Sequence, residues 1–263
     1  MDAQKSEGGA AFTARPLISS VGGATLQPVH GSLVRYRRRF PTMQLTNPPS
    51  AEQFPAVINA MHDDRIARYM PAASGNQEDA FRLYLWNCAL CEAFYLPLHI
   101  AEISVRNALH RRLSERLGDQ WYDNQTFRNI LSDRHFHDLE DALDDERAQH
   151  GLLMTSHHIV SSLSFGFWQH LLTRRFERLL WSVDLRTVFP NLPRSLGRSE
   201  IYDKIEGIRQ WRNRIAHHRA IFDKGPTRKY QDTLMLVRWV CNDVADWLTA
   251  SSKVSAAIAL RPL

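Results

Sequence analysis

The sequence has few cysteines, no long uninterrupted apolar run and no sustained alternation of apolar and polar residues. Three cysteines in 263 residues exclude a disulfide framework and are typical of a reducing compartment. No apolar run approaches the roughly 20 residues of a membrane helix, and Gly, Ser and Pro interrupt the stretch where a signal peptide would be apolar. The missing alternation argues against strands. We therefore expect an all-α, cytoplasmic protein that does not enter the membrane.

Two patterns could be metal sites. Cys88-Ala-Leu-Cys91 is a C-x-x-C, but no second Cys/His pair stands at zinc-finger spacing and the segment is apolar, so we interpret both cysteines as core residues. Asp141 and Asp145 lie one turn apart on a predicted acidic helix over 124–149, which we interpret as a solvated charged face. The sequence therefore predicts no metal and no cofactor.

The positive charge is concentrated in two segments. The formal net charge is +5, but residues 1–50 carry six Lys/Arg against two Asp/Glu, and residues 198–230 carry nine against four. The rest of the chain is acidic or neutral. A basic patch on an otherwise acidic body indicates a polyanionic partner.

The chain divides into a predicted flexible basic tail at 1–46, a helical domain at 47–250 and a C-terminal tail at 251–263. The N-terminal tail is rich in Gly, Ala, Ser and Pro, and its basic run at 35–40 is either an RNA-touching arm or, as we favour, a solvated segment. Within the domain, apolar residues recur at helical spacing, which predicts a bundle of five to seven helices.

Capping signals mark several of these helices. Ser50-Ala-Glu-Gln53 and Asn76-Gln-Glu-Asp79 are N-terminal signatures, and Gly118 is typical of a C-terminal cap. The apolar segment that Gly118 ends contains Pro97, where we expect a kink or break. Four further helices are expected at 124–149, from about 165 to 181 after a loop, from 199 through the segment described next, and at 234–248.

The segment 211–222 concentrates proton-transfer and anion-binding groups. Two adjacent histidines, three arginines and an asparagine lie within eight residues. Histidine accepts and donates protons near neutral pH, and the planar guanidinium of arginine suits phosphate oxygens. These are the groups that metal-free cleavage of a phosphoester requires.

A helix over this segment turns Trp211 and Ile215 toward the core. At ~100° per residue, Asn213 and His217 share a face, and so do Arg214 and His218. Arg212 is about 140° around the axis from His217.

Three segments resemble one family in order and spacing. They are Glu102-Ile-Ser-Val-Arg106-Asn107, Leu163-Ser-Phe165-Gly166-Phe-Trp168, and Arg212-Asn213-Arg214-Ile215-Ala216-His217 with Ile221-Phe222 behind. The last is an R-x4-H with a polar residue after the arginine. Over residues 50–250 the sequence is similar to Abi-like (abortive infection, AbiD/AbiF-type) proteins of the HEPN superfamily.

The resemblance implies a HEPN-like helical bundle that acts as a metal-independent endoribonuclease of the toxin or phage-defence type. It implies a homodimer in which two motifs meet in one cleft, with RNA as the substrate and an antitoxin protein or RNA as a further partner. His217 would be the general base or acid, and Arg212 would bind the scissile phosphate. Asn213 would hold the His217 tautomer or donate to a phosphate oxygen.

Other charged residues near the motif have open roles. His218 is either a second proton carrier or a charge at a helix terminus, and Arg214 and Arg219 are expected to contact RNA phosphates. Glu102 and Arg106 either pair with each other, one turn apart, or line the cleft beside the motif helix. Two alternatives to catalysis remain: a non-catalytic RNA-binding or regulatory module, and a structural adaptor that dimerises through the motif face.

Overall fold

The structure is a computed structural model that describes residues 49–182 and 185–262. The predicted tail at 1–46, with its basic run, lies outside these residues. The described part of the chain contains no strand and is built from α-helices joined by short 3₁₀ and π turns, which confirms the all-α prediction. It holds eleven α-helices, more than the five to seven expected, because several are only one or two turns long.

The helices follow one another along the chain with short connections. In the first half they are α1 (Phe54–Met61), α2 (Asp63–Ala67), α3 (Gln77–Leu117), α4 (Gln125–Ile130), α5 (Asp133–His150) and α6 (Ser156–Ser162). In the second half they are α7 (Phe165–His170), α8 (Arg198–Ala216), α9 (Pro226–Val240), α10 (Asn242–Ser251) and α11 (Val254–Ala259).

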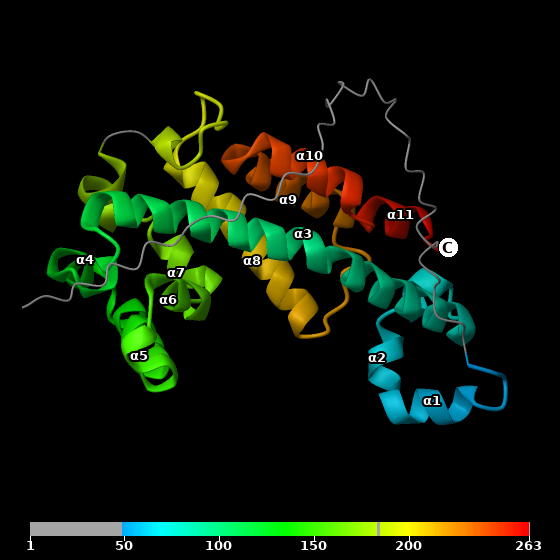
Figure 1. Cartoon of the computed structure of the whole chain (residues 1–263). Coiled ribbons are helices and arrows are strands. Elements are labelled where there is room, and N and C mark those ends of the chain that lie inside the picture. The colour runs from blue at the N-terminus through cyan, green and yellow to red at the C-terminus, as the bar shows by residue number, and fades with distance from the viewer. Residues whose placement is uncertain (1–48, 183–184, 263) are drawn as a thin grey trace, which may run out of the picture. The chain divides into compact units, whose positions relative to one another are not determined.

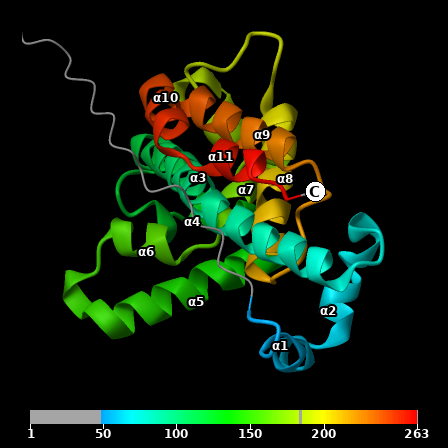
Figure 2. The same cartoon turned by 90° about the vertical axis from the view of Figure 1, so that its right-hand side faces the viewer.

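The helix α3 is the element on which the others pack. It contacts α2, α6, α7, α8, α9 and α11. In Figures 1 and 2, α9, α10 and α11 lie on one side of it and α5 and α6 on the other. Its apolar residues join one large core whose biggest fully buried side chains are aromatic, among them Trp86, Trp121 and Trp168. Burial of so many large rings stabilises the bundle without disulfides.

The ends of α1 and α3 follow their capping signals. Ser50 Oγ accepts from the Gln53 N–H at 3.3 Å while Gln53 Oε1 accepts from the Ser50 N–H at 3.1 Å, although regular helix begins only at Phe54. Asn76 Oδ1 accepts from the Asp79 N–H at 3.0 Å, and Gly118 ends α3 with φ 83°. The predictions for Asn76 and Gly118 are confirmed, whereas the Ser50 capping box forms ahead of α1, whose N-cap residue, Gln53, makes no side-chain cap bond.

Pro97 does not break α3. The helix runs unbroken over 41 residues from Gln77 to Leu117, and Pro97 lies inside it and is buried. An interior proline destabilises a helix by about 3 kcal/mol, and here the packing of α3 on several neighbours outweighs that penalty.

By length and composition α3 could also cross a membrane, a property that the sequence analysis did not assign to any segment. Core helices of soluble proteins pass the same test. In the structure α3 contacts helices on two sides, and 39% of its most apolar window is buried.

Four predicted segments differ from the structure. The helix expected at 234–248 is interrupted at Cys241, which separates the end of α9 from the start of α10. The helix expected at 124–149 is two helices, since Ser132 starts α5 after a break at Leu131. The loop expected before Phe165 contains α6, and the helix expected to run to about Trp181 ends at His170 and continues as short 3₁₀ and π turns. In each case side chains on both sides of the break are buried in the core. Their burial outweighs the helix propensity that would otherwise continue one helix through the break.

The predicted C-terminal tail at 251–263 contains α11, which packs on α3. Val254 and Ala257 are fully buried, and Trp86 Nε1 donates to the Ala257 carbonyl at 2.6 Å. The segment is short and its apolar residues are small, so its sequence resembles that of a tail although its backbone is part of the core.

Candidate functional site

The motif is carried by the last turns of α8. The helix begins at Arg198, where Glu200 Oε2 accepts the Gly197 N–H at 2.8 Å. Its apolar residues Ile201, Ile205, Ile208 and Trp211, a stripe spaced at three and four, are buried. Ile215, which was expected to face the core with Trp211, is only partly buried. Burial of this stripe fixes the rotation of α8 about its axis and therefore which face the motif presents.

The helix ends within the motif and separates its two histidines. The His217 N–H still donates to the Asn213 carbonyl at 3.0 Å, so His217 stays on the face of Asn213. His218 has φ 53°, in the left-handed region, and its backbone leaves the helix. The prediction that Arg214 and His218 share a helical face is therefore wrong.

The chain after the helix is fixed by buried groups of α3. Asn87 Oδ1 accepts from the backbone N–H groups of Ile221 and Phe222 at 2.8 and 3.1 Å. The ring of Phe222 stacks on Tyr69 with centroids 4.8 Å apart. Asn87 was not singled out in the sequence, because one asparagine in an apolar helix gives no sign of its distant partner.

Arg212 is held by two polar groups. Its Nη2 lies 3.3 Å from Glu102 Oε2, and its Nη1 donates to Asn213 Oδ1 at 3.3 Å. Glu102 thus stands beside the motif helix and pairs with Arg212 rather than Arg106. The Arg212 side chain is 44% exposed, so the pair adds little stability but orients the guanidinium. The Asn213 amide oxygen is directed to Arg212 and not to His217.

A basic cavity of about 420 Å³ lies on the His217 side of α8, and we call it the motif cavity. Four of its described lining residues are cations and none is acidic. Trp211 Nε1 is buried with no hydrogen-bond partner among the described residues, and a buried donor of this kind is one that a bound water or ligand would satisfy. The lining residues are Gly207, Gln210, Trp211, Asn213, Arg214, His217, Arg219, Lys224 and Lys229.

The sequence identified only part of this cavity. Arg214 and Arg219, predicted to contact RNA, both line it. The Arg214 guanidinium also donates to the Ala220 carbonyl at 2.9 Å, which ties it to the loop. Lys224 and Lys229 were not singled out, and only the positive charge of 198–230 pointed toward them. Both reach the site because the turn at Gly225, with φ 69°, starts α9 alongside α8.

A second cavity of about 400 Å³ lies between α3 and α8, and we call it the α3–α8 groove. One end is polar, with Arg212, Glu102 and Arg106, and the Nε of Arg106 is buried without a partner among the described residues. The other lining residues are Tyr95, Leu98, His99, Ile103, Ile215 and Ala216. Arg212 and His217 therefore line different cavities. The hydrogen bond from Arg212 to Asn213 joins a residue of the α3–α8 groove to a residue of the motif cavity.

His218 lies in neither cavity. It lines a third, smaller hollow with Arg65, Cys88 and Cys91, and its carbonyl accepts from Arg65 Nη1 at 3.2 Å. Cys88 is exposed and Cys91 only partly buried, so the prediction that both are core residues is wrong for Cys88. Burial raises the pKa of Cys91 to about 12, which keeps the thiol protonated.

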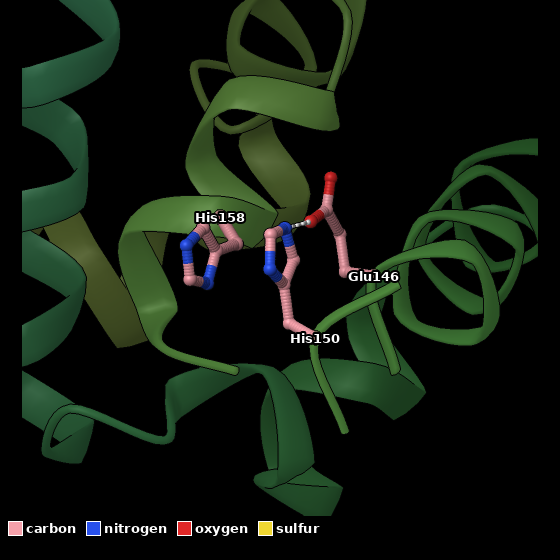
Figure 3. Close-up of side chains that lie close together, drawn as sticks. All are labelled: Glu146, His150 and His158. Atoms are coloured by element: carbon pink, nitrogen blue, oxygen red, sulfur yellow. Dashed lines mark ion pairs between the residues drawn. The ribbon is translucent and has the colours of Figure 1, made fainter. Parts of the chain in front are cut away.

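One cluster has the side chains of a metal site. Glu146 and His150 from α5 and His158 from α6 place donor atoms within 4.8 Å of one another (Figure 3). Glu146 pairs with His150 at 3.2 Å, but the His150 and His158 rings are stacked, with centroids 3.9 Å apart and planes 7° from parallel. Imidazole binds a metal in its ring plane, and two stacked planes share no such position. An ion would require one ring to turn. Turning His158 would break its bond from the Thr155 N–H at 3.0 Å, and turning His150 would break its pair with Glu146 at 3.2 Å.

Comparison of the chain with protein-family models, curated proteins and solved structures found no match. Any functional assignment therefore depends on the site itself. The site consists of the motif cavity, the α3–α8 groove and the Arg212 guanidinium between them.

Proposed function

We propose that the protein is a metal-independent endoribonuclease of the HEPN, Abi-like type. The observation that carries this proposal is the arrangement at the end of α8. An amide and an exposed histidine line a basic cavity that contains an unpaired buried donor, and an oriented arginine lines the neighbouring groove and is hydrogen-bonded to that amide. Phosphate oxygens satisfy each of these groups.

The reaction requires one phosphate site and two proton transfers. Arg212 binds the scissile phosphate and stabilises the charge that develops on its oxygens in the transition state. The ribose 2′-oxygen attacks phosphorus and the 5′-oxygen leaves, giving a 2′,3′-cyclic phosphate and a 5′-hydroxyl. His217 either removes the 2′-hydroxyl proton or protonates the leaving 5′-oxygen, and water carries out the other of the two proton transfers. The cations of the motif cavity hold neighbouring phosphates without reading sequence.

The proposed active form is a homodimer. Within one chain, Arg212 and His217 line different cavities. A second copy that packs against the end of α8 would bring its own motif to the same cleft, so that groups from both chains act on one phosphate. In the cell the substrate is host or phage RNA, and an antitoxin of protein or RNA would restrain the activity.

The first test is cleavage of single-stranded RNA and tRNA in EDTA by wild type and His217→Ala. Loss of a positioned acid or base lowers the rate about 10²- to 10⁴-fold, and the wild-type products should carry cyclic phosphate ends. His137→Ala, which removes an exposed histidine of α5, is the matched control and should retain full activity. Equal rates for wild type and His217→Ala would refute the assignment.

The shared cleft has a separate test. When wild type exchanges subunits with excess His217→Ala, the activity for each wild-type chain should fall, because mixed dimers hold one inactive motif. If the activity for each wild-type chain is the same with and without excess His217→Ala, the cleft is not shared between two chains.

A non-catalytic RNA-binding module is the second candidate. It is favoured by the Glu102–Arg212 ion pair, which partly neutralises the arginine that catalysis would need. Such a module would bind RNA with equal affinity in wild type and His217→Ala and would cleave it in neither.

A further inference from the structure

Tyr95 is a large aromatic side chain on the surface of α3 at the apolar end of the α3–α8 groove. It is 72% exposed, although most aromatic residues of this chain lie in the core. One face of its ring stacks on His99, one turn along α3, with centroids 5.8 Å apart and planes 9° from parallel. Because so much of the side chain is exposed, the opposite face is open to solvent.

We propose that the Tyr95–His99 pair is a stacking platform for a nucleobase of single-stranded RNA, next to the cleavage site. The inference rests on the proposed ribonuclease function and adds how the substrate is selected. Every nucleobase has a π face, so an aromatic ring binds unpaired bases with little regard to sequence. Bases in a duplex are already stacked and paired, and the platform therefore favours unpaired RNA.

The polar end of the groove fits the backbone of the same strand. Arg106 and Arg212 lie there with one carboxylate, Glu102, so the local charge is positive. Arg106 lines this end of the groove beside Arg212, and its Nε is buried without a partner among the described residues. An apolar ring at one end and cations at the other match the two parts of a nucleotide.

The distance along α3 identifies which base is bound. Glu102 is seven residues beyond Tyr95, about 10 Å at 1.5 Å per residue. One strand of B-form DNA rises 3.4 Å per nucleotide. At that rise the distance corresponds to about three nucleotides, and to fewer in an extended strand. The base on Tyr95 is therefore two or three positions from the phosphate at Arg212, outside the reacting nucleotide.

The test is equilibrium binding of a labelled, 2′-O-methylated single strand of about ten nucleotides, which cannot be cleaved. Tyr95→Ala should weaken binding about 5- to 100-fold, as expected for one lost base stack. Tyr95→Phe should bind like wild type. Tyr95→Leu should be as weak as Tyr95→Ala, because leucine keeps apolar surface but cannot stack. Trp247→Ala, which removes another exposed aromatic side chain outside the groove, should have no effect.

A strand with one abasic position tests the location of the base. Removing the base two or three nucleotides from the cleavage site should weaken binding to wild type but not to Tyr95→Ala. Unchanged affinity of Tyr95→Ala would overturn the proposal, and so would full affinity of Tyr95→Leu. If Tyr95→Ala alters the particle mass in sedimentation but not RNA affinity, the ring contacts a second copy of the chain and the platform is refuted.

This experiment is independent of catalysis. RNA binding that depends on Tyr95 in a protein that does not cleave would support the platform and reject the ribonuclease. If cleavage is lost in His217→Ala while RNA binding is unchanged in Tyr95→Ala, the ribonuclease is supported and the platform is rejected.

Discussion

Asn87 should be essential to the loop that follows the motif. Its side chain is 5% exposed, and its amide oxygen accepts both the Ile221 and the Phe222 N–H. Asn87→Leu keeps a similar volume but removes the acceptor, which leaves two buried donors unpaired. Each unpaired donor costs about 1–3 kcal/mol, so we expect the free energy of unfolding to fall by about 2–5 kcal/mol.

Urea unfolding followed by far-UV circular dichroism measures this loss globally, and amide hydrogen exchange at Ile221 and Phe222 measures it locally. The exposed Asn59→Leu on α1 is the control and should change stability by less than about 0.5 kcal/mol. If Asn87→Leu were as stable as its control, with both amides still protected, the two hydrogen bonds would not hold the loop and the reasoning would fail.

Two further predictions concern the helices around the site. Burial, followed by the nearby His135 and Arg175, lowers the pKa of His170 to about 4. The unfolded chain therefore takes up this proton near pH 6.5, before the folded chain does, and stability should fall by about 3 kcal/mol as the pH drops from 7 to 4. His170→Gln should lose less stability than wild type over that range in urea titrations, and parallel curves would contradict the pKa. Ala257→Asp should destabilise the protein by several kcal/mol because it buries an unpaired charge in α11. The exposed neighbour Ala256→Asp should not, and equal melting temperatures for the two variants would mean that α11 does not pack on α3.

Local chemistry explains which parts of the fold could be predicted. The caps at Ser50, Asn76 and Gly118 involve residues within a few positions of one another, so the sequence shows both partners. The apolar stripe of α8 is likewise visible as a period. Pro97 shows the limit of such rules, because the contacts that keep α3 continuous come from distant helices.

The candidate site also has features set by neighbouring residues and features set by contacts between distant helices. The sequence by itself determined the all-α class, the helix that carries the start of the motif and the face shared by Asn213 and His217, whereas the helix expected to run through the whole motif ends at Ala216. Only the tertiary structure decided that His218 turns away, that Glu102 pairs with Arg212 across 110 residues, and that Lys224 and Lys229 reach the motif cavity. The physical reason is that helix periodicity is set by neighbouring residues. The partner of a charged side chain is set by which helices the buried core brings together, and that partner is not encoded at any fixed spacing in the chain.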